Sequence, residues 1–270
     1  MMPGVLLSPE MVEVSRRRCT LIATGHRACY MCPMTRRDSP LKTIFDRVPR
    51  RYDLVNRVVT LGLDSRWRER AVTACLADSP RWILDICTGT GDLAIALARR
   101  TAGTAAIAAA DFSAPMLAVA GRKAVEAGVA GYIDLLLGNA AQLPFADGAL
   151  DAVTVGFGFR NLTYRNPARD HHLREIARIL KPGGRFVIVE SSQPRSAVLR
   201  QGYRLFLRAW VAPLGRLISG QRGAYDYLAR SAAGFYRPEE VEQLLRDAGF
   251  SSVETTPLLG GAAAIHVALR

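Results

Sequence analysis

The chain has 270 residues, of which 49% are hydrophobic and 22% charged, so it can bury the core of one globular domain, and a disordered or fibrous protein is excluded. With 36 Lys and Arg against 24 Asp and Glu, the net charge is +12, which favours anionic partners such as nucleic acid, an acidic membrane surface or phosphorylated substrates. The excess lies in two segments, with +3 in residues 1–38 and +7 in residues 195–237.

Residues 1–40 show no sustained hydrophobic period and are interrupted by Arg and Pro. Cys29 and Cys32 form a lone C-x-x-C without the second pair that a zinc site needs, so two loose thiols are the simpler interpretation. We expect a flexible basic extension here, and the internal methionines suggest a start codon assigned too far upstream. One domain is then expected over residues 41–270.

Neither disulfides nor membrane spans are expected. The five Cys have no paired spacing, and no stretch reaches the roughly 18 apolar residues of a membrane helix. The apolar run 19–24 is also too short for a signal peptide. These features predict a cytoplasmic protein with no metal site.

Short apolar runs alternate with helical patterns from residue 82 onward, which predicts an α/β fold with a doubly wound, mainly parallel sheet and helices on both faces. We expect strands at 82–87, 105–110, 132–137, 150–157, 185–191, 251–256 and 262–269, and helices at 92–100, 113–127, 166–180 and 238–248. The Lys-Pro-Gly-Gly sequence at 181–184 is expected to end the third of these helices.

The turn after the first of these strands is the first chemical signal. Gly89 and Gly91 allow a close approach of ligand to backbone, and the following helix offers unpaired N–H groups. Asp111 ends the next strand, where a carboxylate can accept hydrogen bonds from the hydroxyls of an adenosine ribose. The turn fits a nicotinamide dinucleotide and S-adenosylmethionine (SAM) equally, and Asp111 has the alternative of capping the helix near Ser113.

Several sequence blocks together resemble the UbiE-type C-methyltransferases of ubiquinone and menaquinone biosynthesis. They are found at residues 45–56 (FDRVPRRYDLVN), 61–67 (LGLDSRW), 84–92 (LDICTGTGD), 138–145 (GNAAQLPF), 157–161 (FGFRN), 180–184 (LKPGG) and 263–266 (AAIH). The glycine turn and the LKPGG block are shared by many SAM methyltransferases, whereas YDxxN and FGFRN are far more particular. The resemblance covers nearly the whole chain after residue 41.

This resemblance implies a seven-stranded class I SAM-dependent methyltransferase (Rossmann-like) fold whose last strand is antiparallel. It implies methyl transfer to a ring carbon of a prenylated demethylquinol, either demethylmenaquinol or the benzoquinol of the ubiquinone pathway. The expected SAM-binding residues are Asp85, Gly89, Thr90, Gly91, Asp111, Asn139, Ala140 and Gly156. At Gly156 relatives carry a polar residue, and Asp64 stands where several have His.

Three residues are expected to serve catalysis. Arg160 follows the fourth strand at the carboxyl edge of the sheet, where a fixed cation would stabilise the phenolate that develops on the quinol. Asn161 and Tyr52 are expected to position the substrate. A surface salt bridge for Arg160 and a packing role for Tyr52 are the structural alternatives.

Residues 195–237 interleave large apolar side chains with arginines, which predicts a helical insertion covering the substrate. Arg200, Arg204 and Arg208 recur on one helical side and apolar residues on the other, as in helices that lie on an anionic membrane surface. A lid with a solvated basic face is the alternative. A location on the inner face of the cytoplasmic membrane and a homodimer are expected, without nucleic acid. The competing functions are methylation of another acceptor, including RNA, and a non-catalytic SAM-binding scaffold.

Overall fold

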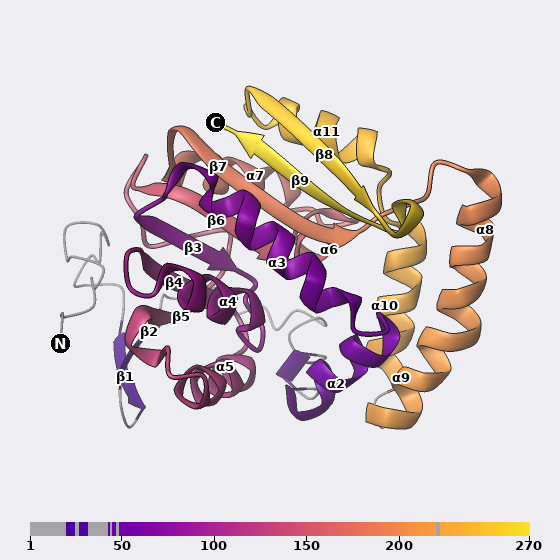
Figure 1. The fold of residues 1–270 in the computed structure, drawn as a ribbon, viewed down its shortest axis with the longest axis horizontal. Coiled ribbons are helices and arrows are strands. Elements are labelled where there is room, and N and C mark those ends of the chain that lie inside the picture. Colours follow the sequence, from indigo (N-terminus) through magenta and orange to yellow (C-terminus); the bar gives the residue numbers. More distant parts are fainter. Residues whose placement is uncertain (1–19, 25–26, 32–42, 44, 47–48, 220–221) are drawn as a thin grey trace.

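The computed structural model describes residues 20–24, 27–31, 43, 45–46, 49–219 and 222–270, with the backbone alone at 20–24, 27–31, 50–52, 216, 218–219 and 222–225. One mixed sheet forms its centre, in the order β1-β2-β5-β4-β3-β6-β7-β9-β8 (Figure 1). The strands are β1 Thr20–Thr24, β2 Arg27–Met31, β3 Trp82–Ile86, β4 Ala106–Asp111, β5 Ile133–Leu137, β6 Leu150–Gly156, β7 Leu180–Ser191, β8 Ser252–Leu258 and β9 Ala263–Leu269.

Helices cover both faces of the sheet, and a further group follows β7 and projects beyond its edge (Figure 1). The α-helices are α2 Pro49–Val59, α3 Leu63–Cys75, α4 Asp92–Thr101, α5 Ala114–Glu126, α6 Phe159–Thr163, α7 Arg169–Ile179, α8 Ala197–Phe206, α9 Ala212–Ser219, α10 Arg222–Gly234 and α11 Pro238–Asp247. A π-helical turn, Leu207–Val211, joins α8 to α9.

The alternation of side chains along the strands separates two cores. Ile83 of β3 packs with residues of α3, α4 and α5, whereas its neighbours Leu84 and Ile86 pack with residues of α6, α7 and α11 on the other face. Successive residues of a strand point to opposite faces, so a strand that is buried on both sides is apolar throughout. The predicted doubly wound α/β fold is confirmed.

The order of the strands decides where the site lies. From β3 the chain runs through β4 to β5 on one side, and it then returns to β6 and β7 on the other. The carboxyl ends of β3 and β6 therefore flank the point where the winding reverses, which is where open α/β sheets bind ligands. β9 is antiparallel to both β7 and β8, as the resemblance implies.

The structure differs from the sequence analysis at the N-terminus, where β1 and β2 pair as an antiparallel ladder within the segment expected to be a flexible extension. β2 joins the sheet through two residue pairs, Tyr30 with Leu136 and Met31 with Leu137. Two five-residue strands are too short to show a hydrophobic period, and their pairing depends on the edge that β5 offers.

A second difference concerns the Lys-Pro-Gly-Gly sequence, which follows the end of a helix as expected but already belongs to the next strand. The α7 helix already ends at Ile179, and β7 begins at Leu180, so residues 181–184 form an irregular stretch within the strand. Gly183 has φ +76°, and a Cβ on Gly184 would lie 2.8 Å from the Lys181 carbonyl oxygen. The two glycines let the chain bulge here without leaving the ladder.

Candidate functional site

The glycine turn connects the end of β3 to the start of α4. Gly91 has φ +83°, and a Cβ there would lie 2.9 Å from the Ala120 Cβ of α5, so only glycine fits this close packing. Gly89 has φ +56°, but a Cβ would meet no heavy atom within 4 Å. The backbone at Gly89 is therefore open to a ligand.

Asp85 lies in β3, just before this turn, and is buried. Its carboxylate is fully buried and accepts hydrogen bonds from the hydroxyls of Thr88 (2.5 Å) and Thr154 (2.9 Å). Burial raises its pKa to about 7. Asp85 is one of the expected SAM-binding residues, and its hydrogen bonds join the start of the turn to β6.

Asp111 ties the turn to the start of α5. Its carboxylate accepts the backbone N–H of Gly89 (2.9 Å) and of Ser113 (2.8 Å), and burial raises its pKa to about 6. The cap of α5 is instead the Ser113 hydroxyl, which accepts from the Met116 N–H at 3.4 Å. A carboxylate has about four acceptor positions, so Asp111 retains capacity for ligand hydroxyls.

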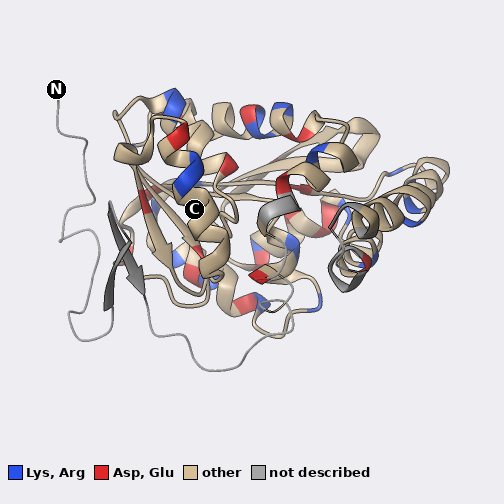
Figure 2. Cartoon of the chain, turned by 90° about the horizontal axis from the view of Figure 1, so that it is seen from below, with Lys and Arg blue, Asp and Glu red and all other residues tan. Residues whose placement is uncertain are grey.

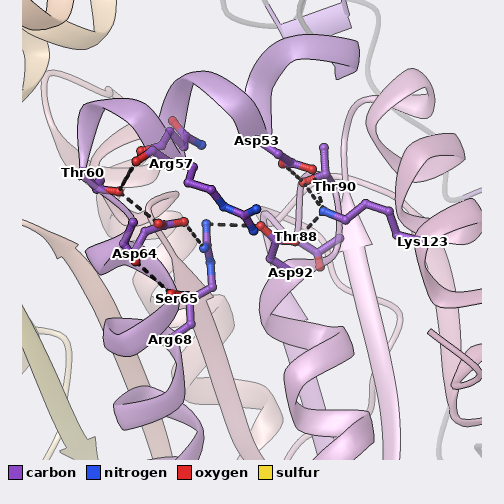
Figure 3. A network of polar contacts seen from close by, with 12 residues as sticks. Asp53, Arg57, Thr60, Asp64, Ser65, Arg68, Thr88, Thr90, Asp92 and Lys123 are labelled. Atoms are coloured by element: carbon purple, nitrogen blue, oxygen red, sulfur yellow. Dashed lines mark hydrogen bonds and ion pairs between the residues drawn. The ribbon is translucent and has the colours of Figure 1, made fainter. Parts of the chain in front are cut away.

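Thr90 is buried, and its hydroxyl is occupied by a polar network that holds α2 against the turn (Figure 3). The hydroxyl donates to Asp53 of α2 at 2.5 Å, and Lys123 of α5 donates to Asp53 at 2.6 Å and also pairs with Asp92. Arg68 of α3 reaches the other oxygen of Asp92 at 3.5 Å. Sequence spacing offers no signal for this network, because Asp53 stands 37 residues before Thr90.

The remaining expected cofactor residues lie just after β5 and at the end of β6. Asn139 is exposed, and its side-chain oxygen accepts the Ala141 N–H at 2.9 Å, forming a local turn, while Ala140 is half-buried. A Cβ at Gly156 would lie 3.4 Å from Leu93 of α4, within ordinary contact distance. These positions lie at the same carboxyl edge of the sheet as the glycine turn.

A largely apolar cavity of about 600 Å³ lies between the start of α3, the ends of β6 and β7, and the helices α8 and α10. Its polar lining residues are Asn56, Thr60, Asp64, Arg160, Ser191 and Tyr203. Its apolar lining includes Trp67 and Phe157, whose rings are 6.3 Å apart. The cavity has the size and lining of a small-molecule site.

Arg160 lines this cavity and is itself buried. One guanidinium nitrogen donates to Glu190 (2.8 Å) and to the Ser191 hydroxyl (2.6 Å), and the Arg160 backbone N–H donates to Glu190 at 3.0 Å. Its Nε is buried without a partner. Arg160 therefore forms a salt bridge with Glu190, as the structural alternative expects. The bridge is buried at the wall of the cavity, however, and does not lie on the surface.

Of the other two expected catalytic residues, Asn161 is not among the described residues that line the cavity. Asn161 accepts a hydrogen bond from the Tyr227 hydroxyl at 3.2 Å, and this bond links α6 to α10. The side chain of Tyr52 lies outside the described residues, although its backbone belongs to α2. Cys32 and the side chain of Cys29 also lie outside them.

Residues that sequence reasoning missed complete the cavity wall and its supports. Tyr203 of α8 is half-buried on the cavity wall, and burial raises its pKa to about 12, so its hydroxyl is a hydrogen-bond donor at neutral pH. Glu190 had one available signal, an acidic residue near the end of a buried strand at the ligand edge. Within the described residues, no helix is long and apolar enough to cross a membrane.

These features fit SAM, which supplies an electrophilic methyl group when bound. The open backbone at Gly89 admits the cofactor, Asp111 has acceptor capacity for the ribose, and the exposed Asn139 stands at the next strand end. The apolar cavity beside this edge would hold a hydrophobic acceptor away from water.

Comparison with known proteins agrees with this geometry. A sequence model of the ubiE/COQ5 methyltransferase family matches residues 34–270. Demethylmenaquinone methyltransferase of Thermus thermophilus is 45% identical over 227 residues, covering 84% of this chain and 100% of that protein. The ubiquinone/menaquinone biosynthesis C-methyltransferase UbiE of Nitrobacter hamburgensis is 35% identical over 250 residues, covering 92% and 97%.

Solved structures share the fold at low sequence identity. An O-methyltransferase family protein from Burkholderia thailandensis superposes with a TM-score of 0.59 at 14% identity, over 82% of this chain and 59% of that one. The [4+2]-cyclase SpnF gives a TM-score of 0.59 at 19% identity, over 88% and 97%. Because a cyclase has this fold too, the fold alone does not set the reaction.

Proposed function

The chain belongs to the ubiE/COQ5 methyltransferase family and is a SAM-dependent enzyme, and from this premise we propose that it methylates a ring carbon of a prenylated demethylquinol. The observation that carries the proposal is the apolar cavity beside the glycine turn, with Arg160 in its wall. The relative at 45% identity is named a demethylmenaquinone methyltransferase, which supports demethylmenaquinol as the first acceptor to test. The benzoquinol of the ubiquinone pathway is the second.

Arg160 has the chemistry that the reaction needs from the protein. A quinol ring carbon becomes nucleophilic when negative charge develops on a ring oxygen, and a guanidinium in a water-poor cavity stabilises that charge strongly. Glu190 holds the Arg160 side chain in one place, so little reorganisation is required during the reaction. We assign Asn161 and Tyr52 to positioning, Asn161 through its bond to Tyr227.

We assign Asp85, Gly89, Thr90, Gly91, Asp111, Asn139, Ala140 and Gly156 to the cofactor site, with separate roles. Gly89, Asp111 and Asn139 are the residues we expect to touch SAM. Asp85 and Gly91 shape the turn, and Thr90 joins it to α2 through Asp53. We base this division on hydrogen bonding: the side chains of Asp85 and Thr90 already bond to other protein groups, so we assign them to the structure of the turn.

The described part of residues 195–237 consists mainly of α8, α9, α10 and the π-helical turn between α8 and α9, and we propose that this segment covers the substrate. Val198, Leu199 and Phe206 of α8 line the cavity and are also exposed, as are Leu61 and Leu259. The mouth of the cavity therefore has an apolar rim, which suits a prenyl tail that passes from the cavity to a lipid phase.

We propose further that these helices dock on an anionic membrane at the cytoplasmic face. Leu205 (66% exposed), Trp210 (50%) and Leu217 (80%) extend the apolar rim along the helices. Arg204 and Arg208 are exposed beside them, and Figure 2 shows basic residues on this projecting part of the molecule. A substrate whose tail resides in the bilayer makes an anionic lipid surface the fitting partner.

The test is turnover with methyl-labelled SAM and demethylmenaquinol or the benzoquinol in lipid nanodiscs. Label should appear in the lipid extract, and mass spectrometry should find one added methyl on the ring. Label recovered instead in added RNA would favour a nucleic-acid methyltransferase. Bound SAM without turnover of any acceptor would favour a non-catalytic scaffold.

A further inference from the structure

Few groups in the cavity wall could take up a proton. Among the described lining residues, the ionisable side chains are Asp64, Arg160 and Tyr203. A guanidinium stays protonated, and the raised pKa of Tyr203 keeps its hydroxyl neutral. Asp64 is the one carboxylate of this set.

Glu190 is nearby but does not line the cavity. Its carboxylate accepts hydrogen bonds from the backbone N–H and the guanidinium group of Arg160. It also accepts hydrogen bonds from the backbone N–H and the hydroxyl of Ser191. It is fully buried and does not belong to the cavity lining. Glu190 therefore acts as the support of Arg160.

Asp64 has a different environment. It lies in the first turn of α3 and is 5% exposed, with one oxygen accepting the Thr60 hydroxyl at 3.0 Å and the other paired with Arg68 (Figure 3). With one partner on each oxygen, the carboxylate retains acceptor capacity on the cavity side.

The surroundings connect Asp64 to the wall that carries Arg160. The guanidinium of Arg68 lies over the Phe157 ring at 5.5 Å, and Phe157 lines the cavity at the end of β6, three residues before Arg160. A ring held in this cavity would thus meet a cationic group from one side and a carboxylate from another.

We propose that Asp64 is the catalytic group that accepts the proton of the quinol hydroxyl, an inference that rests on the function proposed above. The O–H bond breaks, and its proton passes to an Asp64 oxygen while Arg160 stabilises the charge left on the ring oxygen. The ring carbon then forms a bond to the methyl carbon, the methyl–sulfur bond breaks, and its electron pair stays on sulfur, which becomes a neutral thioether. The methylated ring carbon loses its hydrogen as a proton to solvent, and the ring oxygen takes back the proton from Asp64. One proton is released overall.

The experiment compares three variants with the wild type in the labelled-SAM assay across pH 5.5–9. Asp64→Asn keeps the size and the hydrogen-bond acceptor but accepts no proton, whereas Asp64→His supplies a different proton acceptor. Glu69→Gln is the matched control, because Glu69 is an exposed acid on the same helix, 3.9 Å from Arg100. SAM affinity by calorimetry and the thermal midpoint are measured for each protein.

We expect Asp64→Asn to lower kcat at least about a hundredfold, the usual contribution of a general base, with SAM affinity like that of the control. Asp64→His should retain more activity and lose it as the pH falls through about 6.5, where an ordinary imidazole protonates. The wild type and Glu69→Gln should not show that loss at the same pH.

The inference is overturned if Asp64→Asn keeps kcat within threefold of the wild type, or if Asp64→His has the wild-type pH profile. Should Asp64→Asn fail to fold, the pH profile of Asp64→His decides alone. Absence of product with the wild type would reject the proposed function and this inference together, whereas equal product from the wild type and Asp64→Asn would reject this inference only.

Discussion

Arg160 of α6 and Glu190 of β7 form a buried ion pair in which Nη1 lies 2.8 Å from Oε1. The other Glu190 oxygen accepts the Arg160 backbone N–H at 3.0 Å, so one carboxylate fixes both ends of the arginine. The pair as a whole is neutral. It therefore acts on the cavity as an oriented dipole whose positive end is Arg160, and its effect on catalysis depends on this orientation.

Arg160→Ala should lower kcat at least about a hundredfold at saturating quinol and SAM, because it removes the positive end of this dipole from the cavity. Arg165→Ala, which alters an exposed arginine five residues later, is the control. Since the change also leaves Glu190 buried without its charged partner, rates are normalised to the fraction of protein that binds SAM. A higher KM with unchanged kcat would make Arg160 a binding residue only.

Asp111→Ala should weaken SAM binding by about 1.5–3 kcal/mol, the usual contribution of a hydrogen bond to a charged group. Titration calorimetry measures this change. The variant should also unfold at lower urea concentration, because the N–H groups of Gly89 and Ser113 lose their acceptor. Undiminished SAM affinity in the folded variant would remove Asp111 from the cofactor site.

The buried carboxyl of Asp85 should make the protein less stable as the pH rises from about 4 to about 7. Burial raises its pKa to about 7, so the folded state binds more protons than the unfolded state in that window. His266, whose pKa burial lowers to about 4, acts in the opposite direction, because its stabilisation is lost as the pH falls. The difference in free energy of unfolding between Asp85→Asn and the wild type isolates the contribution of Asp85 from that of His266.

Urea unfolding without SAM at several pH values measures that difference. Relative to the wild type, Asp85→Asn should gain free energy of unfolding steadily as the pH rises through the window. Asp247→Asn, which changes an exposed acid at the end of α11, should follow the wild type. A wild-type-minus-variant difference that is constant with pH would contradict the raised pKa.

Co-sedimentation with vesicles tests the membrane surface. Changing Arg200, Arg204 and Arg208 to Gln should weaken binding to anionic vesicles by about 1 kcal/mol per arginine, and salt should weaken the wild type similarly. The matched control changes three exposed arginines of α4 and α5: Arg99, Arg100 and Arg122. If binding does not depend on lipid charge or on salt, these helices are only a lid over the substrate and not a surface for anionic membranes.

A chain that starts at Met34 should keep its SAM affinity and turnover, with a free energy of unfolding within about 1 kcal/mol of the full chain. β2 contributes two residue pairs at the sheet edge, and the family match itself begins at residue 34. Activity and urea unfolding of the shortened chain check this. A large loss of stability would mean that the β1–β2 ladder supports β5.

Features that depend on local pattern could be predicted from the sequence. Apart from the earlier start of β7, the strands from β3 onward and helices α4, α5, α7 and α11 appear within a few residues of the expected bounds, because their periods follow from which faces are buried. The Gly89–Gly91 turn could be predicted for the same reason, since only a residue without a side chain suits its backbone and packing.

The tertiary structure alone decided which side chains meet. Asp53 contacts Thr90 and Lys123, which lie 37 and 70 residues further along the sequence, and Arg160 pairs with Glu190, 30 residues further along. These separations are too long for any hydrophobic periodicity to predict the contacts. The placement of Asp64 on the cavity wall likewise requires the position of α3 relative to β6 and β7. The sequence by itself therefore determined the fold and the cofactor turn, which are matters of local periodicity and backbone freedom. The charges around the substrate cavity were decided by packing, which brings distant segments together at one edge of the sheet.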